Sequence, residues 1–86
     1  MKITADRKKL EREIYKALYD INKNKEIKNQ ILTNLINRGF SAGLAQQILN
    51  KNIALEFLDD DRLGLIALQI FNATYEPMVD PSLYFD

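Results

Sequence analysis

Apolar residues recur at helical spacing along most of the chain and predict several amphipathic helices. In residues 5–22 they follow one another at intervals of three, four and one positions, which places them on one helix face: Leu10, Ile14, Ala17, Leu18 and Ile21. Thr4 is the predicted N-cap of this helix, with Asp6 in its first turn. A second helix is predicted over 26–38 from the same spacing of Ile27, Ile31, Leu32, Leu35 and Ile36.

The motif RGFS predicts a tight corner between the second helix and a third helix over 42–50. Gly39 is expected to adopt a left-handed conformation just past the second helix, and Phe40 to fold back onto Leu35 in a Schellman turn. Ser41 is the predicted N-cap of the third helix. Helix termination, turn and restart thus explain the motif without any contact to a ligand.

The last third of the chain predicts a fourth helix followed by an irregular tail. The segment IALEFL fits a helical turn or a short extended piece, and three aspartates at 59–61 are expected to cap the next helix, over 62–75. Apolar side chains nearly encircle that helix, which indicates a central position or an interface. Pro77 then ends helical geometry. We therefore predict a helical domain over 1–76 and an extended tail over 77–86 that packs on the domain or leads to a further region.

These patterns predict an all-α fold, a small bundle of about four helices with a partly apolar C-terminal tail. Leu65 and Leu68 fall on a different face of the fourth helix from its other apolar residues, and a chain of 86 residues forms only a thin core. We therefore expect a homodimer or another protein partner, bound through Leu65 and Leu68 and through four residues of the tail: Met78, Leu83, Tyr84 and Phe85.

The residue types present exclude several kinds of chemistry. The chain contains no cysteine and no histidine, so it lacks thiolates, disulfides and the commonest general base and transition-metal ligand. Its three glycines do not form a phosphate-binding loop. The aspartate run does not have EF-hand spacing, because Ile70 occupies the twelfth position, where a glutamate is required. We expect no enzymatic activity, no cofactor and no bound metal.

Charge is distributed unevenly along the chain. Residues 1–38 carry ten basic and five acidic side chains, whereas residues 39–86 carry two basic and seven acidic ones. Such asymmetry marks a nucleic-acid surface or two parts that attract each other within or between chains, and the net charge of zero favours the second interpretation. No apolar run approaches the roughly 20 residues that span a bilayer, and no signal peptide is evident. We therefore expect a cytoplasmic protein with no membrane contact.

The corner also resembles parts of two known families. The stretch RGFSAGLAQQIL is similar to the first turn and second helix of a ubiquitin-associated domain. Residues 27–71 resemble one three-helix repeat of RecX-type recombination regulators, in the Gly-Phe turn and in a later Leu-Asp-Asp step. Because unrelated groups share this motif, it indicates a stable helical corner and not a particular function.

Two functions follow from these patterns. The first is a non-enzymatic protein-interaction or regulatory module that self-associates through the fourth helix or the tail. The alternative is a small DNA-binding regulator, in which the helix over 42–50 lies in a major groove as in a helix-turn-helix protein. Amides would then read adenine edges and cations would hold phosphates. The candidate DNA contacts are Arg38, Gln46, Gln47, Asn50 and Lys51.

Overall fold

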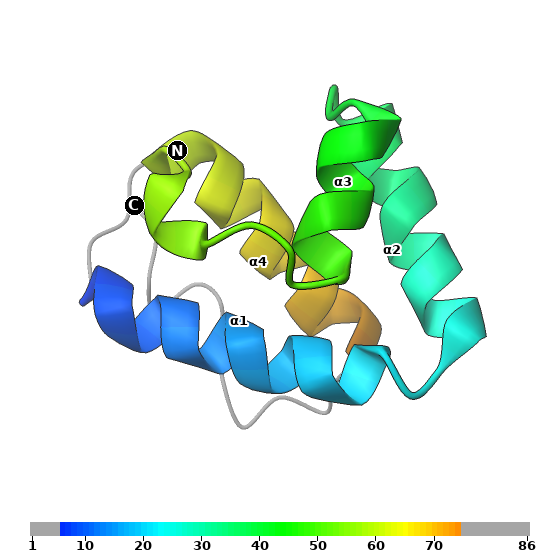
Figure 1. Cartoon of the computed structure of the whole chain (residues 1–86), viewed down its shortest axis with the longest axis horizontal. Helices are drawn as coiled ribbons and strands as arrows, with labels where there is room; N and C mark the ends of the chain where they lie inside the picture. The colour runs from blue at the N-terminus through cyan, green and yellow to red at the C-terminus, as the bar shows by residue number, and fades with distance from the viewer. Residues whose placement is uncertain (1–5, 75–86) are drawn as a thin grey trace.

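The computed structural model describes residues 6–74, and this range forms four α-helices and one short 3-10 helix, with no strand (Figure 1). The elements are α1 (Arg7–Ile21), α2 (Lys25–Asn37), α3 (Ala42–Leu49), the 3-10 helix η1 (Leu55–Phe57) and α4 (Asp60–Thr74). The predicted all-α fold is confirmed. The four tail residues predicted to bind a partner, Met78, Leu83, Tyr84 and Phe85, lie outside the described range.

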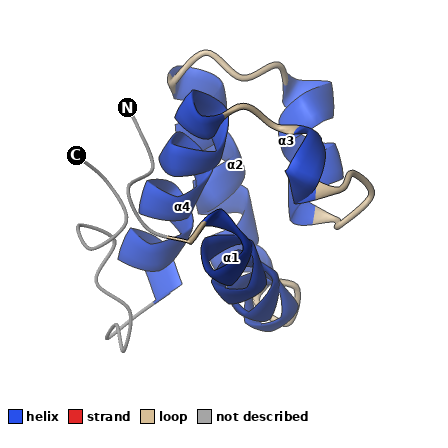
Figure 2. Cartoon of the chain, turned by 90° about the vertical axis from the view of Figure 1, so that its left-hand side faces the viewer, coloured by secondary structure: helices blue, strands red, loops and turns tan. Residues whose placement is uncertain are grey.

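Helix α4 is the central element of the bundle. It packs against both α1 and α2, while α3 packs against α2. Figures 1 and 2 show α4 beside α1 in two perpendicular views. The apolar residues of α4 that face these neighbours are almost completely buried: Leu63, Ile66, Ala67, Ile70 and Phe71. The near-encircling apolar pattern of this helix therefore reflects a central position.

The start of α1 differs from the prediction. Asp6 is the N-cap, and its Oδ1 accepts a hydrogen bond from the backbone N–H of Lys8 at 3.0 Å. The prediction of Thr4 as the cap was wrong. Aspartate ranks above threonine as an N-cap, and it also favours the positive end of the helix dipole. As a consequence, the helix begins at Arg7, whose side chain lies within reach of other elements.

The predicted corner between α2 and α3 is confirmed in detail. Gly39 has a φ of 103°, and its N–H donates to the carbonyl of Ile36 at 3.1 Å. The N–H of Phe40 donates to the carbonyl of Leu35, also at 3.1 Å, which completes a Schellman turn. Ser41 then caps α3 by accepting a hydrogen bond from a backbone N–H at 3.2 Å.

Helix α3 ends in a second turn of the same kind, which the sequence did not indicate. Lys51 has a φ of 60° although it is not a glycine. Its N–H donates to the carbonyl of Ile48 at 3.1 Å, and the N–H of Asn52 donates to the carbonyl of Gln47 at 2.8 Å. A residue with a side chain thus occupies a left-handed position that favours glycine.

The aspartate run caps α4, as predicted. Oδ1 of Asp59 accepts a hydrogen bond from the backbone N–H of Arg62 at 2.7 Å, and Asp60 and Asp61 occupy the first turn. The helix begins two residues earlier than predicted because Asp59, the first member of the run, is the cap. In the described part of the chain, no helix has the length and apolar character needed to cross a membrane.

Candidate functional site

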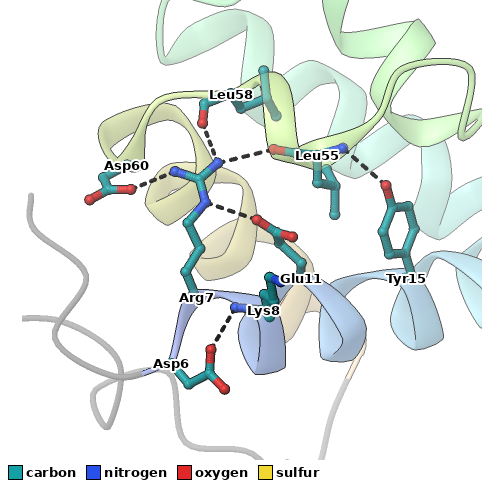
Figure 3. Close-up of polar contacts among 8 residues, drawn as sticks. All are labelled: Asp6, Arg7, Lys8, Glu11, Tyr15, Leu55, Leu58 and Asp60. Atoms are coloured by element: carbon teal, nitrogen blue, oxygen red, sulfur yellow. Dashed lines mark hydrogen bonds and ion pairs between the residues drawn. The ribbon is translucent and has the colours of Figure 1, made fainter.

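The side chain of Arg7 links η1 to both α1 and α4 (Figure 3). Its Nη2 donates to the carbonyl of Leu55 at 3.1 Å and to the carbonyl of Leu58, at the two ends of the 3-10 turn. Its Nη1 donates to Oδ1 of Asp60 at 2.5 Å, and its Nε to Oε2 of Glu11 at 2.8 Å. A planar guanidinium can satisfy four acceptors in this way, whereas a lysine ammonium, with three donors on a flexible stem, cannot.

The charge on Arg7 is stabilised by the acceptors around it. The hydrogen bond to Glu11 raises the pKa of Arg7 above its ordinary value, and the bond to Asp60 acts in the same direction against the effect of desolvation. The side chains of Arg7 and Glu11 are 29% and 9% exposed. Arg7 therefore stays protonated across the working pH range, and its own titration does not release the turn.

Tyr15 fixes the same turn from a second point on α1. Its hydroxyl accepts a hydrogen bond from the backbone N–H of Leu55 at 3.0 Å, and the Leu55 side chain is fully buried. Two residues further on, the side chain of Phe57 is 83% exposed, against 59% for Tyr19 and 41% for Ile36. The turn therefore presents an aromatic ring to solvent from a backbone that is held at both ends.

Two acidic residues lie near Phe57 in the sequence, Glu56 and Asp59, and both are exposed. Glu56 also shares a surface hollow with Lys8 and Arg12, so cations lie near this turn as well. We call residues 55–59 the Phe57 ridge. The sequence pattern did not identify this feature, because the donors that hold it come from Arg7, which lies 48 to 53 positions away from the acceptors in η1 and α4. The sequence offered one signal, the aromatic residue Phe57 in the segment IALEFL, whose apolar spacing fits either a helical turn or an extended piece.

A hollow of about 390 Å³ lies between the α2–α3 corner and the first turns of α4. We call it the arginine hollow, because Arg38 and Arg62 lie in its lining. Arg38 forms no ion pair with another residue of the range 6–74. The Nε of Arg62 lies 4.0 Å from Oδ2 of Asp59, and both side chains are more than half exposed, so this pair is weak. The other lining residues are Gly39, Phe40, Ser41, Leu44 and Leu65.

The hollow brings together residues that the sequence assigned to different functions. Leu65, a predicted protein contact, is half-buried and lines the hollow beside Arg38, a predicted DNA contact. Leu68 is also half-buried on α4. The predicted second apolar face of α4 is therefore partly accessible within the described residues, and partner binding through it stays a prediction.

The residues predicted to contact DNA have different surroundings. The Oδ1 of Asn50 accepts a hydrogen bond from the ammonium of Lys28. The ammonium of Lys51 lies 5.5 Å from the centre of the Tyr19 ring, and that of Lys23 lies 4.4 Å from it. Two of the five candidates thus contact side chains of their own chain. The remaining candidates on α3 are exposed: Gln46 and Gln47.

Two residues of the aspartate run serve structural roles. Asp59 caps the helix and Asp60 pairs with Arg7. Across residues 6–74, the structure contains no group of three or more histidine, cysteine, aspartate or glutamate side chains arranged to hold a metal ion. No protein-family model, curated protein or solved structure matches the chain. The Phe57 ridge and the arginine hollow are the candidate binding surfaces of the described residues.

Proposed function

We propose that the chain is a non-enzymatic protein-interaction or regulatory module, and that Phe57 is its contact residue. The single observation that carries this proposal is an aromatic side chain 83% exposed on a turn whose two ends are hydrogen-bonded to Arg7. Isolated apolar residues are common on protein surfaces. Phe57 differs from them because the backbone that carries it is fixed at several points. The Leu55 side chain is buried and its N–H donates to the Tyr15 hydroxyl, and Arg7 donates to the carbonyls at both ends of the turn.

The energetics of such a residue favour binding. Burial of a phenylalanine side chain stabilises a complex by about 1.5–3 kcal/mol relative to its exposure to water. Binding also costs less when the contact residue is already held in place, since little backbone entropy is then lost. The exposed carboxylate of Glu56, next to Phe57 in the sequence, favours a partner surface that combines an apolar depression with positive charge.

Photocrosslinking tests this proposal directly. A photoreactive phenylalanine analogue at position 57 should form covalent products with protein, either a second copy or a different chain, when irradiated in an extract of the native host. The matched control places the analogue at position 19, which is also aromatic and exposed. Equal labelling from both positions, or none from position 57, would contradict the proposal.

A small DNA-binding regulator is the second candidate. The observation that favours it is that Lys23 and Lys51 gather around the exposed ring of Tyr19, which places two cations on one surface where phosphates can be bound. Binding of random duplex DNA at low salt, where phosphate contacts are strongest, tests it. Replacement of Gln46, Asn50 and Lys51 by alanine should abolish that binding if they read the duplex. An unmodified chain that binds no duplex eliminates this candidate.

A further inference from the structure

The arginine hollow has a defined chemical preference. Part of its lining is apolar, with Phe40 only 7% exposed and Leu44 and Leu65 half-buried. Arg38 and Arg62 supply two guanidinium groups, one without an ion pair among the described residues and the other in a weak pair. Apolar lining with arginine beside it suits an apolar or aromatic side chain that has carboxylates next to it.

The Phe57 ridge has the complementary composition. It presents an exposed aromatic ring next to the exposed carboxylate of Glu56, whereas Asp59 caps α4 and faces Arg62 of its own chain. The hollow has a volume of about 390 Å³, and a cavity of about 150 Å³ is already sufficient to hold a benzene ring. Size and charge therefore both permit the ring of Phe57 to enter a hollow of this kind.

We infer that Phe57 of one copy inserts into the arginine hollow of a second copy, with Glu56 beside the guanidinium of Arg38. This inference rests on the proposed function and names its partner as the same chain. It agrees in sign with the charge asymmetry along the sequence, because Glu56 from the second half of one chain meets Arg38 from the first half of another. Within one chain, Arg7 and Asp60 pair in the same sense.

The positions of the two surfaces suit a symmetric pair. The ridge directly precedes α4, and Arg62 lies in the first turn of the same helix. Figure 1 shows η1 next to the start of α4. Asp59 of the ridge lies 4.0 Å from Arg62 of the hollow, so the two surfaces are neighbours on one copy, and a two-fold axis near the beginning of α4 can set each ridge opposite the other copy's hollow in two equal contacts. Such a reciprocal contact closes the assembly at a dimer.

A charge exchange between two variants of the full chain tests this inference. Arg38→Glu places an acid in the hollow, and Glu56→Lys places a cation on the ridge; both positions are exposed. Each variant alone then sets like charges opposite each other, which should weaken association about tenfold or more. In an equimolar mixture, both contacts of a mixed dimer join opposite charges. Glu56 of the first variant meets Arg38 of the second, and the lysine introduced at position 56 meets the glutamate introduced at position 38, so a mixed dimer should form. Sedimentation at low salt measures both results, and circular dichroism checks that each variant is folded.

The outcomes separate this inference from the proposed function. Dimers of both single variants as stable as the unmodified dimer, or a mixture that stays monomeric, would overturn the inference. An unmodified chain that is monomeric at high micromolar concentration would also overturn it. If position 57 still crosslinks to a different protein in either case, the proposed function stands. If it crosslinks to nothing, both fail.

Discussion

Arg7, the first residue of α1, and Asp60, the first residue of α4, form an ion pair with 2.5 Å between Nη1 and Oδ1. The two residues are 53 positions apart in the sequence. Their pairing joins the starts of two packed helices, and the same Arg7 side chain donates to the carbonyls of Leu55 and Leu58 in the turn that precedes α4. The position of Phe57 therefore depends on a contact made at the opposite end of the described sequence.

Arg7→Lys should destabilise the fold by about 1–3 kcal/mol, because hydrogen bonds to charged groups are lost and carbonyls at the turn are left without a donor. The charge is retained, so the loss reports the geometry of the guanidinium. Chemical denaturation measures the change. Arg12→Lys is the control, since Arg12 is exposed on the same helix. Equal stability of the two variants would show that the four hydrogen bonds of Arg7 do not support the turn.

Truncation to alanine should have very different effects on stability at the two phenylalanines of the described turns. Phe40 is 7% exposed, and Phe57 is 83% exposed. Phe40→Ala should cost about 3–5 kcal/mol in the free energy of unfolding, because it removes a buried ring from the corner. Phe57→Ala should change that free energy by less than about 0.5 kcal/mol in the dissociated chain. Thermal melts of dilute protein distinguish the two. A Phe40→Ala variant that melts like the unmodified chain would refute the architectural role of the corner.

Local sequence signals predicted most of the fold. Residues such as Gly39, Ser41 and Asp59 act within a few positions of themselves, so their roles as turn and caps are visible in the sequence. The apolar period of α4 likewise indicated a central position or an interface, and the helix packs centrally against α1 and α2. The Arg7 contacts were not predictable, because no periodic pattern shows which acceptors an arginine reaches across the bundle. The arginine hollow was missed for the same reason, since the α2–α3 corner, α3 and α4 form it together.

Gly39→Ala should destabilise the chain by roughly 1–2 kcal/mol, since a residue with a Cβ is strained at a φ of 103°. An added Cβ meets no atom within 4 Å at Gly39 or at Gly43, so crowding plays no part at either site. Gly43→Ala, inside α3, is therefore the matched control and should leave stability unchanged or raise it. Similar losses at both positions in urea denaturation would contradict the left-handed assignment of Gly39.

Lys51→Gly should stabilise the chain by about 1 kcal/mol, because glycine adopts the left-handed conformation without the penalty that a side chain incurs. The φ of Lys51 is 60°. Lys51→Ala is the control, since it removes the ammonium near Tyr19 but keeps the backbone strain. The denaturant midpoint of unfolding should rise for Lys51→Gly and should not rise for Lys51→Ala. A lower midpoint for glycine than for alanine would show that the second Schellman turn is unstrained.

Tryptophan fluorescence tests most directly whether a second copy covers Phe57. The chain has no tryptophan, so Phe57→Trp introduces a single reporter at the ridge, and Tyr19→Trp provides the control. In dilute solution, both variants should emit at the long wavelengths of a water-exposed indole. With rising protein concentration, the emission from position 57 should shift to shorter wavelengths while that from position 19 stays constant, and Arg38→Glu added to the Phe57→Trp chain should weaken the shift. An emission from position 57 that remains that of an exposed indole at every concentration would contradict the account.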